Sequence, residues 1–254
     1  MNAFSQNIGL EKIRPENIET RWYPLFKIGG ISALVIVLII PIQSYIFIVF
    51  SPPTTAIRFF ELLQQNWFIG LLDLDFLYII NTVLMIFVYL ALYFALRKVN
   101  ESYMLIALIT GLTGTVIYFS STIAFEMFSL SNQYKAATTE AERSIFLAAG
   151  ETMLAIYKGT AFDVYYIISA FSLLLFAIVM LQSHFFSKTT AYFGLASGIF
   201  MVVPSTAGTI GLVFAFTSLI PWAVFSVLIA RKFFEFGKTN QVQGGSKVFY
   251  INQY

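Results

Sequence analysis

An uncharged apolar run near the N-terminus decides the class of fold. Residues 28–50 read IGGISALVIVLIIPIQSYIFIVF, without one acidic or basic side chain. A helix that crosses the hydrocarbon core of a bilayer needs roughly 20 predominantly apolar residues. This stretch supplies them, so we predict that it spans a membrane.

Further apolar runs follow along the chain. Clear ones lie near residues 71–96, 103–128 and 162–182, and a longer one extends from about 190 to about 230. The last is too long for one span and suits two, with the break at the turn-forming VPSTAGT of residues 203–209. The pattern predicts an all-α, polytopic membrane helix bundle of about six transmembrane helices.

The composition agrees with a chain that lies mostly in lipid. Of its 254 residues, 58% are apolar and only 11% are charged, whereas soluble domains carry roughly 25% charged residues. The net charge of +2 and the scattered basic residues argue against a nucleic-acid partner. The chain has no cysteine and one histidine, His184, and it lacks phosphate-binding, zinc-helix and serine-elbow motifs. We therefore expect no catalytic, cofactor or metal site.

The distribution of basic residues predicts the orientation. With six spans, most lysines and arginines fall on the side that holds both termini, and the positive-inside rule places that side in the cytoplasm. The expected organisation is a cytoplasmic N-terminal tail, 1–27, a six-helix transmembrane domain, 28–236, and a flexible cytoplasmic C-terminal tail, 237–254.

Two amphipathic segments are expected at the membrane surface. Residues 56–67, AIRFFELLQQNW, end on a tryptophan that suits the headgroup region. Residues 139–158 open with Thr139 and Glu142 spaced as a capping box. Their expected apolar stripe consists of Phe146, Ala149, Met153 and Ile156. Both segments are predicted to be interfacial helices, the second on the outer side.

Four acidic residues fall inside or beside the apolar runs, where an ionisable side chain is costly and indicates a function or a partner. They are Asp73 and Asp75 early in the second span, Glu126 late in the third, and Asp163 at the start of the fourth. The predicted topology places all four at the outer ends of their helices. The candidate site is an outer-leaflet cluster of Asp73, Asp75, Tyr78, Thr122, Glu126, Glu151, Lys158 and Asp163.

A structural explanation competes with the functional one. Asp73, Asp75 and Asp163 are expected at helix N-termini, where the helix dipole favours an anion. Glu126 is expected near a helix C-terminus, where the dipole opposes it, so it needs water or a cationic partner such as Lys158.

Polar and small residues recur at helical spacing on two of the predicted spans. On the third span they are Gly111, Thr115, Tyr118, Thr122 and Glu126, and on the second they are Asp75, Tyr78 and Thr82. The two faces could line a cavity or form interhelical hydrogen bonds, and we favour the hydrogen bonds. Gly194 and Gly198 allow close approach of another helix, in this chain or in a second copy.

Short motifs also resemble a known family. They are LDFLY at 74–78, LALY at 90–93, AAGE at 148–151, GTAF at 159–162, YFGL at 192–195, VP at 203–204 and PWA at 221–223. The chain resembles, over about residues 60–236, an uncharacterised family of bacterial integral membrane proteins, domain of unknown function 4386. The resemblance implies a multi-pass protein of a bacterial cytoplasmic membrane and implies no activity.

Three classes of function remain open. The leading hypothesis is a non-enzymatic structural or accessory protein that binds membrane lipids, a second copy or another membrane protein. The alternative is a transporter or channel-like protein for a cation or small amphiphile that uses Asp75, Glu126 and Asp163. The third is an intramembrane enzyme with Glu126 or Asp75 as acid or base.

Overall fold

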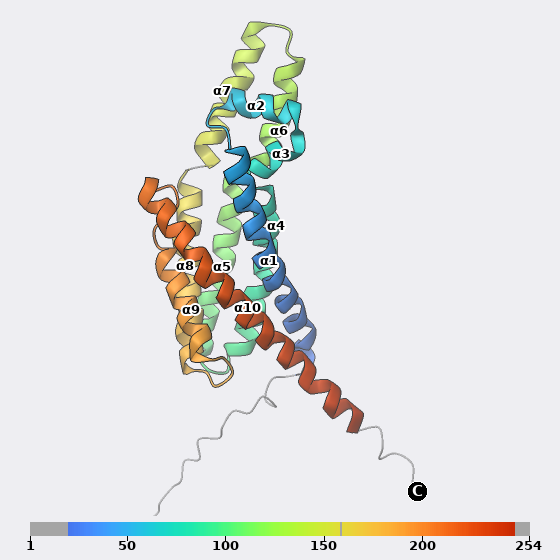
Figure 1. Ribbon diagram of the computed structural model, residues 1–254, viewed down its shortest axis with the longest axis vertical. Coiled ribbons are helices and arrows are strands. Elements are labelled where there is room, and N and C mark those ends of the chain that lie inside the picture. Colours follow the sequence, from blue (N-terminus) through green and yellow to red (C-terminus); the bar gives the residue numbers. More distant parts are fainter. Residues whose placement is uncertain (1–19, 158, 247–254) are drawn as a thin grey trace, which may run out of the picture.

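The computed structural model describes residues 20–157 and 159–246, and these residues form helices joined by short connections, with no strand among them (Figure 1). A short 3-10 helix, Thr20–Trp22, precedes α1. The α-helices are α1 (Tyr23–Phe50), α2 (Ala56–Gln65), α3 (Trp67–Asp73), α4 (Phe76–Leu96), α5 (Glu101–Ser121), α6 (Ala124–Ala136), α7 (Glu140–Tyr157), α8 (Thr160–Gln182), α9 (Lys188–Phe200) and α10 (Gly208–Ser246). The all-α prediction is confirmed. Helix α10 continues past residue 236, where the C-terminal tail was expected to begin.

Within the described residues, five helical segments are long and apolar enough to cross a membrane. They are Tyr23–Phe50, Phe76–Leu96, Glu101–Ala136, Glu140–Gln182 and Gly208–Gly237. The sixth expected span is α9, whose 13 residues rise about 20 Å, less than a hydrocarbon core of about 30 Å. Helix α9 and the turn after it bring the chain back, so that α1 begins and α10 ends at the same end of the bundle (Figure 1). We call this the basal end.

Glycines set the packing of α1 at the basal end. A Cβ on Gly29 would lie 2.6 Å from the Ala91 Cβ of α4, and a Cβ on Gly30 would lie 3.1 Å from the Phe234 ring of α10. The backbone of α1 therefore approaches both neighbours closely. Farther along, α1 and α10 diverge (Figure 1). The two helices are thus tightly packed at the basal end and separated beyond it.

Small residues also join α8 to its neighbours. A Cβ on Gly111 of α5 would lie 2.8 Å from Ser172 Oγ, and that hydroxyl donates to the Ala107 carbonyl at 2.6 Å. On α9, Gly194 and Gly198 face Ala177 and Leu174 of α8, respectively. The close approach that these glycines predict therefore occurs within the chain.

The end opposite the basal end is formed by α2, α3, α6 and α7, which we call the distal cluster (Figure 1). Phe60 is fully buried there, and a Cβ on Gly150 would lie 2.7 Å from its ring. The apolar face of α2 thus packs against protein. The hairpin of α6 and α7 extends along the long axis of the molecule, beyond the end of α1 (Figure 1).

The buried face of α7 differs from the expected stripe. Leu154 is buried and Leu147 packs against the core of the distal cluster, whereas Ile156 is 41% exposed. The contact with α2 runs through Gly150, so the buried stripe is centred on the line of Leu147, Gly150 and Leu154. The side of α7 that contacts the distal cluster is therefore rotated from the apolar stripe that the sequence predicts.

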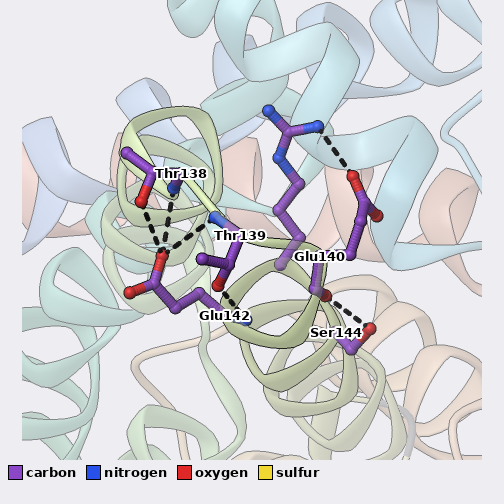
Figure 2. A network of polar contacts seen from close by, with 6 residues as sticks. Thr138, Thr139, Glu140, Glu142 and Ser144 are labelled. Carbon is purple, nitrogen blue, oxygen red and sulfur yellow. Dashed lines mark hydrogen bonds and ion pairs between the residues drawn. The ribbon is translucent and has the colours of Figure 1, made fainter.

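The capping box at the start of α7 is confirmed (Figure 2). The Glu142 carboxylate accepts from the backbone N–H groups of Thr138 and Thr139 at 3.0 and 3.2 Å, and Thr139 Oγ1 accepts from the Glu142 N–H at 3.2 Å. Each such cap stabilises a helix by about 1 kcal/mol. The box therefore begins α7 at Glu140 and forms the tip of the hairpin.

Candidate functional site

A cavity of about 550 Å³ lies inside the bundle, between α1, α4, α8 and α10. Helices α5 and α7 and the turn between α9 and α10 complete its wall. This volume is within the usual range for sites that hold one small molecule. The cavity begins where α1 and α10 diverge.

The wall of the cavity changes from polar to apolar along its length. In chain order α4 contributes Asp75, Tyr78, Asn81 and Thr82 and then Met85, Val88, Tyr89 and Leu92. In the same direction α8 contributes Phe162, then Tyr165, Tyr166 and Ser169, and then Leu173 and Phe176. Both helices run from the distal cluster toward the basal end (Figure 1). The polar end of the cavity therefore lies beneath the distal cluster, and the apolar end points toward the base.

Asp75 lies at the polar end, in the turn between α3 and α4. Its φ of 62° is left-handed, a conformation that aspartate tolerates better than most residues. Although Asp75 is the N-cap of α4, its side chain makes no capping bond. Instead, Oδ2 accepts a hydrogen bond from the Tyr157 hydroxyl, and Oδ1 is buried without a partner. The turn thus directs the carboxylate into the cavity.

Two buried oxygen atoms on the cavity wall have no hydrogen-bond partner. They are Asp75 Oδ1 and Asn81 Oδ1, on residues that are 6% and 8% exposed. Each buried polar group left without a partner costs about 1–3 kcal/mol. Such groups are normally satisfied by protein, water or a ligand. The polar end of the cavity is therefore built to hold hydrogen-bonding groups.

Five tyrosines surround this end of the cavity: Tyr78, Tyr118, Tyr157, Tyr165 and Tyr166. The rings of Tyr118 and Tyr165 have centroids 4.8 Å apart, and those of Tyr165 and Tyr166 are 6.0 Å apart. These residues come from four helices, so the cluster is a product of the tertiary fold. Of the five, the sequence interpretation included only Tyr78 in the candidate site. The spacing of Tyr165, Tyr166 and Ser169 on one face of α8 was the available signal.

Asp73 occupies a different position from the one expected. It is the last residue of α3, where the helix dipole opposes an anion, and not the start of a span. It is 1% exposed, and neither carboxylate oxygen has a partner. Burial raises the pKa of Asp73 to about 6. Burial also raises the pKa of Asp75 to about 7, an effect that the Tyr157 hydrogen bond opposes and the neighbouring Asp73 charge strengthens.

Glu126 is also placed differently. Helix α5 ends at Ser121, and Glu126 lies in the first turn of α6, where the dipole favours a negative charge. Its side chain is exposed. Thr122, in the break between the helices, donates to the Phe119 carbonyl at 2.9 Å. Neither residue lines the cavity. The expected position of Glu126 near the C-terminus of a helix is wrong, because the residue lies at the start of α6.

The other residues of the candidate cluster have separate roles. Glu151 is exposed and accepts from the Ala56 N–H at 2.9 Å, which supports the first turn of α2. Asp163 is in the first turn of α8, as expected, and accepts a hydrogen bond from Thr206, a residue of the cavity wall. Lys158 lies outside the described residues. The structure thus brings Asp75 and Tyr78 to the cavity, with Asp163 at its edge.

The polar face of the second predicted span lines this cavity, and so do Thr115 and Tyr118 of the face on the third. Thr82 Oγ1 donates to the Tyr78 carbonyl at 2.7 Å, and Thr115 Oγ1 donates to the Gly111 carbonyl at 3.1 Å. These bonds stay within one helix. Thr82 and Thr115 are both part of the cavity wall, so the favoured reading, hydrogen bonds between helices, is wrong for them.

The cavity reaches the surface of the bundle on one side. Leu212 and Phe216 of α10 belong to its wall and are also 50% and 54% exposed. Phe47 of α1 is part of the wall and half-buried. Residues of α10 and α1 thus contribute both to the cavity wall and to the surface of the bundle. Both helices contain an internal proline, Pro41 and Pro221.

The chemistry of the wall favours binding. Among the described residues that line the cavity, Asp75 is the one carboxylate, and none is lysine, arginine or histidine. The described residues also contain no group of three or more acidic or histidine side chains placed to hold a metal ion. The site combines one buried carboxylate, oxygen acceptors, tyrosine rings and a long apolar wall.

Comparison with known proteins identifies a family. A family model described as "Domain of unknown function (DUF4386)" matches residues 28–235, which include every residue that lines the cavity. No curated protein and no solved structure matches the chain. The match covers most of the chain and agrees with the resemblance in its sequence motifs, and the chain therefore belongs to the DUF4386 family.

Proposed function

We propose that this protein is a non-enzymatic membrane protein that binds a small amphiphile in the cavity between α1, α4, α8 and α10. The observation that carries the proposal is the change from polar to apolar wall along one cavity. An amphiphile likewise has a polar head group at one end and an apolar tail at the other. Its head group would lie near Asp75, and its tail would extend along Leu92, Leu173 and Phe176.

The wall residues that reach the surface of the bundle support access from within the bilayer. Leu212 and Phe216 face both the cavity and the surface that lipid would cover. An amphiphile already in the membrane could enter sideways, without exposing its tail to water. Because lipid tails are as apolar as the wall, transfer of the tail gains little hydrophobic energy. The head group therefore has to supply most of the selectivity.

The basic residues support an orientation for the site. Basic residues lie near the start of α1 (Lys27), directly after α4 (Arg97 and Lys98) and in the second half of α10 (Arg231 and Lys232). These parts of the three helices meet at the basal end (Figure 1). The positive-inside rule favours a cytoplasmic location for that end. The polar end of the cavity would then open toward the outer leaflet of a bacterial cytoplasmic membrane.

The enzymatic reading has weaker support. General acid–base catalysis usually employs a second positioned group beside a carboxylate. The described wall offers Asp75 and tyrosines but no histidine or lysine to pair with it. Binding uses every feature of this wall, whereas catalysis would use only a few.

Quenching of Trp222 fluorescence tests the proposal, because this residue lines the cavity. The protein is placed in phosphatidylcholine nanodiscs and titrated with dodecylamine and dodecanol that carry bromine on the terminal carbon. The Trp222→Phe variant gives the fluorescence of the other two tryptophans, which is subtracted to leave the contribution of Trp222. We expect saturable quenching of Trp222 by at least one of the two probes.

Two variants on α10 provide a matched comparison. Ala215→Phe fills the cavity, because Ala215 is part of its wall. Val213→Phe changes a residue that is 58% exposed and does not line the cavity. Saturable quenching should be lost in Ala215→Phe and kept in Val213→Phe. Quenching that never saturates, or that is equal in both variants, would overturn the proposal.

A further inference from the structure

We propose that the head group held at the polar end of the cavity is a cationic amine, with Asp75 as its counter-ion and tyrosine rings around it. This inference rests on the proposed function, because it names the class of amphiphile that the same cavity selects. It does not follow from the shape of the cavity, which would suit a neutral or anionic head equally well.

The first argument is the state of the Asp75 carboxylate. Tyr157 donates to Oδ2 only, and Oδ1 is buried, unpartnered and on the cavity wall. A buried carboxylate requires a bound proton or a paired positive charge. Since no basic side chain occurs among the described residues of the wall, a cationic occupant can provide that charge.

The second argument is the identity of the unpartnered atoms. Asp75 Oδ1 and Asn81 Oδ1 are both oxygens that accept a hydrogen bond. Asn81 lies about 9 Å beyond Asp75 along α4, at 1.5 Å per residue. An ammonium has donors and no acceptors. A carboxylate or phosphate head would instead leave the Asp75 charge unpaired and bring a second negative charge beside it.

The third argument is the ring of tyrosines. Aromatic faces carry negative potential and attract an ammonium or a quaternary amine that lies within about 6 Å of the ring centroid. Tyr118, Tyr165 and Tyr166 line the polar end from α5 and α8 with their rings in mutual contact. The rings can therefore surround a cation that Asp75 neutralises.

The neighbours of Asp75 strengthen the charge argument. The described titratable groups that interact electrostatically with it are Asp73 on α3, Tyr78 on α4, Tyr118 on α5, Tyr157 on α7, and Tyr165 and Tyr166 on α8. All of them are acids, so each is neutral or negative. This set repels an anionic head group and favours a cationic one.

The test compares probes that share one tail and differ in the head. Terminally brominated dodecylamine, dodecyltrimethylammonium, dodecanol and dodecanoate are titrated against Trp222 fluorescence in phosphatidylcholine nanodiscs at pH 8, with affinity expressed per mole of lipid. We expect both cations to bind at least about tenfold more tightly than dodecanol, a difference of about 1.4 kcal/mol. Dodecanoate should bind more weakly than dodecanol.

Two carboxylate variants locate the effect. Asp75→Asn should remove at least about tenfold of the affinity for both cations while changing dodecanol binding less than about twofold. Glu126→Gln removes an exposed carboxylate that does not line the cavity, and should leave all affinities within about twofold. Dodecanol binding also reports whether each variant is folded.

The outcomes separate this inference from the proposed function. Saturable binding of dodecanol with no preference for the cations, or equal loss for all probes in Asp75→Asn, would overturn the cationic head group and leave an amphiphile-binding cavity. The ranking of the four probes on the native chain tests whether the head group is cationic even if Asp75→Asn does not fold. No saturable binding of any probe would overturn the proposed function itself.

Discussion

The Tyr157 hydroxyl donates a hydrogen bond to Asp75, and this contact joins the last residue of α7 to the residue that precedes α4. Tyr157 belongs to the distal cluster by its packing and to the cavity wall by its hydroxyl end. One side chain therefore connects the projecting hairpin to the polar end of the cavity. The conformation of α7 is linked to the charge state of the carboxylate.

Removing that hydroxyl should destabilise the protein in a pH-dependent way. In Tyr157→Phe both Asp75 oxygens would be buried without a partner, and the pKa of Asp75 would rise further because the bond that lowers it is gone. The expected loss is about 1–3 kcal/mol, larger at pH 8 than at pH 5, where the carboxyl is protonated. Thermal unfolding in detergent measures it.

Tyr134→Phe is the control, since Tyr134 packs against the Phe60 ring in the same cluster. It should change the melting temperature equally at both pH values. A Tyr157→Phe protein that behaves like this control would show that the contact with Asp75 has no energetic role.

Cation binding should weaken as the pH falls. Asp75 has a pKa of about 7 in the folded protein, so below that pH a proton competes with the cation for the carboxylate. The affinity for dodecyltrimethylammonium, whose charge is permanent, should fall by up to about tenfold per pH unit below 7. Titrations of Trp222 fluorescence between pH 5 and pH 8 measure the slope. The Asp75→Asn variant should show none, and a native chain without a slope would contradict the role of Asp75.

Asp73→Asn should stabilise the empty protein at neutral pH. The pKa of Asp73 is raised in the folded state, from 3.8 to about 6. A carboxyl of this kind favours folding most below pH 3.8, and its contribution is lost as the pH rises through 6. Asparagine keeps the shape and cannot ionise. The melting temperature should therefore increase at pH 8 and stay unchanged at pH 4, and a decrease at pH 8 would indicate that the charged form has a partner.

The basal contact of α1 should be sensitive to one added methyl group. In Gly29→Ala the new Cβ would lie 2.6 Å from the Ala91 Cβ and 3.2 Å from the Phe87 carbonyl oxygen. Overpacking of this kind costs about 1–3 kcal/mol. Gly237→Ala on α10 is the matched control, because nothing lies within 4 Å of its Cβ position. Thermal unfolding should show a loss only for Gly29→Ala, and equal melting temperatures would contradict the packing of α1 on α4.

Local sequence patterns predicted those parts of the fold that depend on local physics. The uncharged run of residues 28–50 forms most of α1, the turn signal at 203–209 lies after α9 and reaches the start of α10, and Thr139 and Glu142 form the capping box. Length of apolar run, turn chemistry and capping are properties of neighbouring residues. They can be read without knowing which helices meet.

The errors arose where tertiary structure decides. The chain breaks between α5 and α6 at Thr122 and Ile123, with neither proline nor glycine there, so Glu126 was assigned to the wrong end of a helix. Asp73 was misplaced because the short helix α3 comes before the span. The cavity itself depends on the divergence of α1 and α10 after their tight contact at Gly30, which no local pattern encodes.

The most direct test of the account is saturable quenching of Trp222 by brominated dodecylamine in the Ala215→Phe and Val213→Phe variants. If an amphiphile binds inside the cavity, the native chain and Val213→Phe will show the same saturable quenching, and Ala215→Phe will show none. Equal quenching in all three proteins, rising without saturation as the probe enters the lipid, would show that the probe stays outside the bundle and would contradict the account.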